Sequence, residues 1–156
     1  MKSYQKLIVL LSLGICLFSL ESYIKYFLIL NKVPKQGFYF FNILQIALFP
    51  NQNIAFSLPL PQILTIVIVI VILMVLSYIW VQSLLKNNLW GLTASSLIIL
   101  GALSNLLDRL LFGFVIDYIN IFIWPVFNLA DIMIVAGIII YILSEFKKPK
   151  VKTLTI

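Results

Sequence analysis

Three of the chain's five acidic residues lie between residues 101 and 131, inside a sequence that is otherwise almost entirely apolar. An ionisable group at membrane depth is costly unless it is paired or hydrated, so a carboxylate in such a place indicates a functional site. Two carboxylates a few ångströms apart tend to share one proton. One of them can then take a proton from water while the other donates a proton to a carbonyl. Asp117 and Asp131, separated by a short connection, are the candidate catalytic pair.

Two predicted helices flank this connection, over residues 91–112 and 126–146. Polar side chains near the facing ends of these helices recur at the spacing i, i+3 or i+4, which places them on one helix face. The first helix carries Asn105, Asp108 and Arg109, and the second carries Asn128 and Asp131. Neighbours in sequence point to different sides of a helix, so Asp108 and Arg109 are not expected to pair with each other.

Gly113 is expected to end the first of these helices, and Pro125 to be an early residue of the second. Asp117 lies between them in a short apolar connection, Val115 to Asn120. The connection is too short to place Asp117 far from Asp131, so the two carboxyl groups are predicted to meet.

The composition places the chain among membrane proteins. Of its 156 residues, 63% are hydrophobic and only 10% are charged, and the mean hydropathy is +1.14, outside the usual range of soluble domains. A membrane span requires roughly 20 apolar residues. Four segments qualify, over residues 7–30, 63–85, 91–112 and 126–146. We predict one integral membrane domain over residues 1–156, an all-α bundle of four transmembrane helices.

The longest segment outside these spans, residues 31–62, is rich in proline and aromatic residues. Its apolar run is too short to span a bilayer, and aromatic rings favour the membrane interface. We therefore expect a small platform on the outer side of the membrane, between the first two helices, in which short β-strands can form.

Seven lysines fall on one side of the membrane if there are four spans: Lys2, Lys6, Lys86, Lys147, Lys148, Lys150 and Lys152. Cytoplasmic loops carry an excess of lysine and arginine, so both termini are predicted to be cytoplasmic and the acidic cluster to lie toward the outer face. Lys32 and Lys35 are exceptions on the outer side. Because the lysines gather at the ends of the spans, we interpret the net charge of +6 as a signal for membrane orientation. No nucleic-acid partner is expected.

Cys16 is the only cysteine, and the chain has no histidine. This inventory excludes an intrachain disulfide, the usual zinc sites and a serine–histidine triad, so neither a metal nor a cofactor is expected. The tetrapeptide ending at Cys16 superficially resembles a lipobox, but that motif has a small residue before the cysteine, and Ile15 is not small. Cys16 is therefore interpreted as a buried, inert thiol.

Three ordered blocks resemble signal peptidase II, the bacterial lipoprotein signal peptidase family. The blocks are Gly101, Ala102, Leu103, Asn105, Leu106, Asp108 and Arg109, then Val115, Ile116, Asp117 and Tyr118, then Trp124, Pro125, Phe127, Asn128, Ala130 and Asp131. The resemblance implies that Asp117 and Asp131 form a catalytic dyad. It also implies that Asn105, Arg109 and Asn128 line the site, where Asn105 and Asn128 would support the dyad.

The resemblance extends to two further segments. Glu21 and Lys25 stand at i and i+4, a spacing suited to mutual neutralisation near the interface, and they match a D-Q-x-x-K pattern in which glutamate here replaces aspartate. Asn51 begins a segment, residues 51–57, that resembles N-x-G-A-A-F-S, which contributes to the family's platform over the active site. The resemblance therefore implies that Asn51 binds substrate or supports the dyad. Asp108 is expected to be structural and to fix a backbone amide, a lysine or a tyrosine. Arg109 is expected either to reach the interface or to hold a substrate carbonyl or lipid oxygen.

The resemblance implies an intramembrane aspartyl endopeptidase in the bacterial inner membrane. Its partners would be membrane lipids and diacylglyceryl-modified prolipoproteins, cut just before the modified cysteine, and it would need no cofactor. The alternative from the residues alone is a small multi-pass transporter whose intramembrane acids bind a cation or relay protons. A transporter would place polar groups along a route through several helices, whereas here they cluster at the outer ends of three spans.

Overall fold

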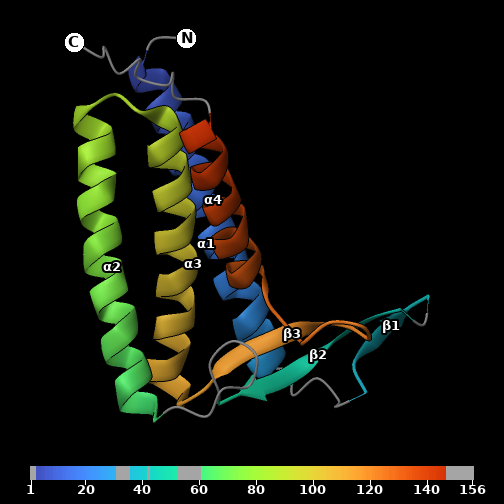
Figure 1. Ribbon diagram of the computed structural model, residues 1–156. Coiled ribbons are helices and arrows are strands. Elements are labelled where there is room, and N and C mark those ends of the chain that lie inside the picture. Colours follow the sequence, from blue (N-terminus) through green and yellow to red (C-terminus); the bar gives the residue numbers. More distant parts are fainter. Residues whose placement is uncertain (1–2, 31–35, 42, 53–60, 147–156) are drawn as a thin grey trace, which may run out of the picture.

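The computed structural model describes residues 3–30, 36–41, 43–52 and 61–146. It consists of four helices and a small three-stranded sheet (Figure 1). The helices are α1 (Ser3–Leu30), α2 (Gln62–Leu85), α3 (Leu89–Phe112) and α4 (Leu129–Phe146), and the strands are β1 (Phe38–Phe40), β2 (Leu44–Asn51) and β3 (Val115–Ile121). All four helices are long and apolar enough to cross a membrane. The predicted four-helix membrane fold is therefore confirmed, and the segment predicted to form a platform contains strands β1 and β2.

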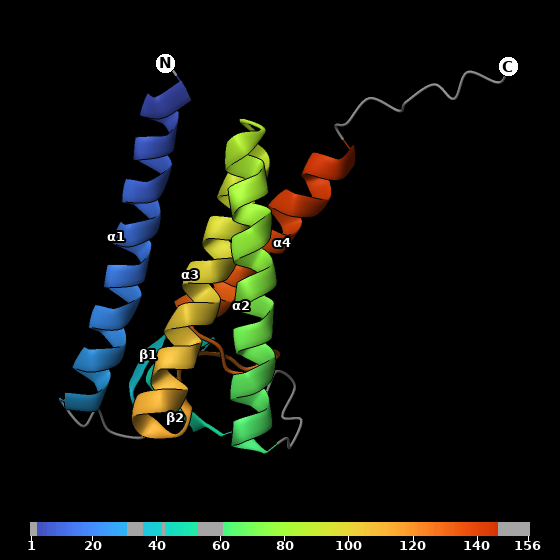
Figure 2. The same cartoon turned by 90° about the vertical axis from the view of Figure 1, so that its left-hand side faces the viewer.

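Helix α3 is the centre of the bundle. Half of its most apolar window is buried inside the molecule, against 6% for α2 and 11% for α1. Figure 1 shows α3 between α2 and α4, and Figure 2 shows α4 crossing it obliquely. Helix α2 contains a β-branched run that would favour a strand in water, but a segment in lipid must satisfy its backbone groups internally and so forms a helix.

Glycines allow α3 and α4 to approach closely at two levels. A methyl group on Gly101 of α3 would clash with the carbonyl oxygen of Ala130 and with Ile134 on α4. A methyl group on Gly137 of α4 would clash in turn with α3, at Ala94. Small residues at helix interfaces in membranes permit this kind of backbone contact.

The sheet lies at the end of the bundle opposite the start of α1 and the end of α4 (Figure 1). Its three strands are antiparallel, with β2 in the middle. The segment after α3, which was predicted to be a short connection, forms strand β3. The register places Asn51 opposite Val115 and Phe49 opposite Asp117, so strands from the segment between α1 and α2 form one sheet with the strand that carries Asp117.

Two expectations about the fourth helix and the cysteine were wrong. Helix α4 begins at Leu129, not at 126, and Pro125 precedes it, because the preceding residues form a bridge from Phe127 to Ile119 of β3. Cys16 is exposed and not buried, because most of α1 faces outward from the bundle. Residues 53–57 and the terminal lysines Lys2, Lys147, Lys148, Lys150 and Lys152 lie outside the described residues, so the structure does not test the predictions for them.

Candidate active site

Asp131 is held by the start of α4. The carboxylate atom Oδ2 of Asp131 accepts a hydrogen bond from the backbone amide of Asn128 at 3.2 Å, and Oδ1 of Asn128 accepts one from the amide of Asp131 at 2.9 Å. This reciprocal arrangement is a capping box with aspartate at the third helical position. The i, i+3 spacing seen in the sequence therefore orients this carboxyl group at the positive end of the helix dipole.

Asp117 is held by β3 and its neighbours. Its Oδ2 accepts a hydrogen bond from Nδ2 of Asn51 at 2.7 Å, and its Oδ1 accepts one from Nδ2 of Asn128 at 2.9 Å. Asn51 belongs to β2 and Asn128 directly precedes α4, so three elements meet at this carboxyl group. The side chain is 2% exposed.

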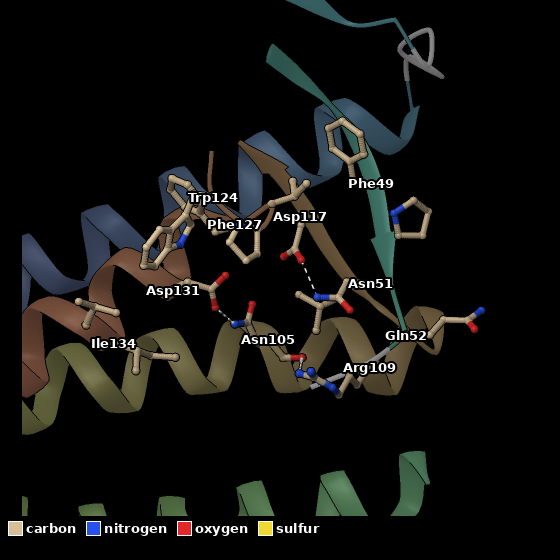
Figure 3. A pocket seen from close by; sticks show the side chains of 15 residues that line it. Phe49, Asn51, Gln52, Asn105, Arg109, Asp117, Trp124, Phe127, Asp131 and Ile134 are labelled. Atoms are coloured by element: carbon tan, nitrogen blue, oxygen red, sulfur yellow. Dashed lines mark hydrogen bonds between the residues drawn. The ribbon is translucent and has the colours of Figure 1, made fainter. Parts of the chain in front are cut away.

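Both aspartates line one cavity of about 730 Å³. Figure 3 shows Asp117 entering it from β3 and Asp131 entering it from α4, with Asn105 and Arg109 of α3 along another side. Most of the remaining wall is apolar, including Phe49, Val115, Trp124, Phe127, Ile134 and Val135. The sequence-predicted dyad and all four of its predicted supporting polar residues thus border a single cavity or, in the case of Asn128, contact the dyad directly.

Asparagine side chains connect the two carboxyl groups. Asn105 donates from Nδ2 to Oδ1 of Asp131 at 2.8 Å, and its own Oδ1 accepts from Nδ2 of Asn128 at 3.0 Å. The same nitrogen of Asn128 contacts Asp117. Each aspartate is therefore approached by amide donors, which stabilise a carboxylate without protonating it.

Burial raises the pKa of Asp117 to about 7. The hydrogen bond from Asn51 opposes this rise, and the nearby Asp131 carboxyl adds to it. A carboxyl group with a pKa near neutrality can both gain and lose a proton under physiological conditions, which suits it to general acid–base chemistry.

Arg109 borders the cavity and does not simply extend away along its helix. Its Nη1 donates to the backbone carbonyl of Asn105 at 3.2 Å, and its side chain is half-buried. Of the two roles considered for Arg109, this position favours contact with a molecule in the cavity.

Behind the dyad, a second polar cluster lies between α1, α3 and β3. Lys25 forms ion pairs with Glu21 at 3.0 Å and with Asp108 at 2.7 Å. The sequence predicted that Glu21 and Lys25 neutralise each other near the interface. The structure instead buries both side chains against α3, because the third charged partner, Asp108, comes from that helix.

Tyr118 completes this cluster, a role that was not predicted from its place in the second of the three blocks. Its hydroxyl donates to Oε2 of Glu21 and accepts from the backbone amide of Leu129 at 3.2 Å, so it ties α1 to the start of α4. Burial, together with the adjacent Glu21, raises the pKa of Tyr118 and keeps its hydroxyl protonated as a donor. The available signal in the sequence was a tyrosine directly after Asp117.

Asp108 fastens the start of β3 to α3. Its Oδ2 accepts from the backbone amide of Ile116 at 3.0 Å as well as from Lys25. We expect Asp108→Asn to lower the thermal midpoint or the amount of folded protein in detergent more than it lowers turnover per folded molecule. Thermal unfolding and the activity of purified protein would measure both. Unchanged folding with lost turnover would place Asp108 in the site itself.

Known proteins resemble this chain in sequence and in fold. A family model described as "Signal peptidase (SPase) II" matches residues 13–147. The lipoprotein signal peptidase of Halothermothrix orenii is 52% identical over 58 residues, which are 37% of this chain and 40% of that protein. That of Moorella thermoacetica is 65% identical over 40 residues, 26% of this chain and 27% of that protein. These matches thus span less than half the length of either relative.

A solved structure described as a bacterial membrane enzyme, determined by the in meso method at 2.3 Å resolution, has the same fold. Its TM-score to this chain is 0.80 at 26% identity, and the match covers 95% of this chain and 93% of that one. A second such structure, at 1.9 Å resolution, gives a TM-score of 0.76 at the same identity, over 90% of this chain and 94% of that one.

Proposed function

The chain belongs to the signal peptidase II family, and on this premise we propose that it is an intramembrane aspartyl endopeptidase that removes signal peptides from bacterial prolipoproteins. Cleavage takes place just before the diacylglyceryl-modified cysteine. The observation that carries the proposal is the placement of Asp117 and Asp131 on one cavity, joined through the Asn105 and Asn128 amides.

The proposed mechanism needs only the dyad and a water molecule. One aspartate, as the carboxylate, takes a proton from the water, while the other, protonated, donates to the scissile carbonyl. A tetrahedral gem-diol forms and then collapses, and a proton passes to the leaving amine. The two carboxyls act as one unit that shares a proton, so the roles belong to the pair and not to fixed residues.

The cavity wall suits a substrate that is part peptide and part lipid. Ile134 and Val135 of α4 form an apolar side, and Val135 is also exposed on the outer surface of the bundle, where membrane lipids lie. A diacylglyceryl chain can therefore reach the cavity laterally from the bilayer, while the polar dyad faces the peptide bond. Arg109 is placed to hold a carbonyl or ester oxygen of this substrate.

A transporter is the less supported alternative. Among the described residues, the buried acids are Glu21, Asp108 and Asp117. These three and the half-buried Asp131 all lie in the sheet-side half of the molecule. A relay of protons or cations through the bundle would require polar groups in the other half as well.

The test of the proposal is a cleavage assay with one purified diacylated prolipoprotein. The native chain should release the signal peptide, and Asp131→Ala should not. No cleavage by native, folded protein would contradict the proposed activity.

We further propose that both ends of the chain are cytoplasmic and that the active site faces outward, because lysines gather at one side of the spans. In a Cys16→Ser background, a cysteine at Gln36 should react with a membrane-impermeant thiol reagent in intact cells, and one at Lys86 should not. Both positions are exposed in the structure. A permeant reagent that labels both provides the control, and the reverse pattern would invert the orientation.

A further inference from the structure

Lys25 is a buried cation with more partners than a simple ion pair provides. Besides Glu21 and Asp108, its ammonium group donates to Oγ of Ser104 at 3.0 Å and to Oδ1 of Asn105 at 3.1 Å. The lysine is only 3% exposed. The contact with Asn105 connects Lys25 to the dyad, because Asn105 also donates to Asp131.

An ammonium group can only donate hydrogen bonds, so it discriminates between the two ends of a side-chain amide. At Asn105, the oxygen must face Lys25, which leaves Nδ2 to face Asp131. The opposite orientation would place the NH₂ group against a cation and an amide oxygen against a carboxylate. Both contacts would be repulsive.

The same orientation extends to the other aspartate. Because Oδ1 of Asn105 is the acceptor, Asn128 must approach it with Nδ2, and that nitrogen also donates to Asp117. Lys25 and Asn128 therefore both donate to Oδ1 of Asn105, while Asn105 donates to Asp131 and Asn128 donates to Asp117. These hydrogen bonds link Lys25 to both carboxyl groups.

We infer that Lys25 is a positioning residue of the active site: its ammonium group fixes the side-chain amide of Asn105 so that the amide donates to Asp131. The inference rests on the proposed peptidase function. It assigns Lys25 a role in turnover in addition to its ion pairs, whereas Glu21, which does not contact Asn105 in the described contacts, serves mainly to neutralise Lys25 and to hold Tyr118.

A double-mutant cycle tests this path. Lys25→Met removes the donor, and we expect kcat per folded molecule to fall roughly tenfold with KM changed less than about twofold, since only the orientation of the catalytic groups is altered. In an Asn105→Ala background, Lys25→Met should cause no further decrease beyond about twofold. Losses that multiply, or an unchanged kcat in the single variant, would overturn the inference.

The matched control is Glu21→Gln, which alters the same cluster but leaves the Lys25–Asn105 contact in place. It should keep kcat per folded molecule within about threefold of native even if the thermal midpoint falls. If Lys25→Met alone does not fold, the double variant Glu21→Gln/Lys25→Met takes its place, because it preserves the net charge of the cluster. Its kcat is then compared with that of Glu21→Gln. The same tenfold loss of kcat supports the inference, and equal kcat values overturn it.

A spectroscopic measurement separates this inference from the proposed function. In protein labelled with ¹⁵N-asparagine, the side-chain signals of Asn105 are identified by their loss in Asn105→Ala. Lys25→Met should shift or broaden them as the amide samples both orientations, while Glu21→Gln should not. Failure of the native protein to cleave would contradict only the proposed function, whereas unchanged Asn105 signals in Lys25→Met would overturn the role of Lys25.

Discussion

Asp117→Asn and Asp131→Asn should each reduce cleavage of a diacylated prolipoprotein to below about 1% of native turnover, with folded protein retained. Asparagine keeps the size of aspartate but cannot accept and return a proton, and a positioned acid or base typically contributes about 10² to 10⁴ in rate. Burial raises the pKa of Asp117 to about 7, so the fold already accommodates the uncharged form of this side chain, and a neutral amide is expected to be tolerated. Turnover per folded molecule, with folding checked by thermal unfolding, measures the effect.

The double variant should be little worse than either single variant, because the two carboxyls work as one unit. Asp108→Asn is the matched control: it makes the same change at a third buried aspartate, which contacts Lys25 and the amide of Ile116 and not the dyad. If either dyad variant, once folded, keeps more than roughly a tenth of native turnover, the shared-proton mechanism is wrong.

The parts of the site that could be predicted from sequence are those set by local geometry. The i, i+3 spacing of Asn128 and Asp131 is a helix-start pattern, and it forms a capping box in the structure. Helical spacing likewise placed Asn105 and Arg109 on one stretch of α3, and both border the cavity. Local spacing could not show that the intervening segment would pair with β2, since that pairing joins residues more than 60 positions apart.

The cluster around Lys25 depends on tertiary packing, so only part of it could be predicted from the sequence. The Glu21–Lys25 spacing indicated the pair, but Asp108, Ser104 and Asn105 join it only because α1 packs against the sheet-side end of α3. The error at Cys16 has the same origin. In a membrane protein both the interior of the bundle and the lipid are apolar. Hydropathy alone therefore does not indicate which face of α1 is buried.

The close approach of α3 and α4 leads to the second large expected effect. Gly101→Ala should lower turnover per folded molecule by at least about tenfold, because the new methyl group meets the carbonyl oxygen of Ala130, a backbone atom that cannot rotate away. Ala130 directly precedes Asp131, so relief of the clash displaces the dyad, and a shift of about 1 Å in a reacting group can cost about 10²-fold in rate. Overpacking of this kind typically also costs about 1–3 kcal/mol of stability.

Gly137→Ala provides the matched control, since it introduces the same methyl group at the same helix pair but away from the dyad. There the new group would meet Ile98 at 2.6 Å and the carbonyl oxygen of Ala94 at 2.7 Å. We expect a comparable fall in thermal midpoint with turnover per folded molecule within about threefold of native. If the two variants lose turnover per folded molecule equally, the loss does not depend on the contact with Ala130, and the contact at Gly101 does not set the position of Asp131. If Gly101→Ala alone loses turnover, the distance between α3 and the first turn of α4 controls the geometry of the catalytic pair.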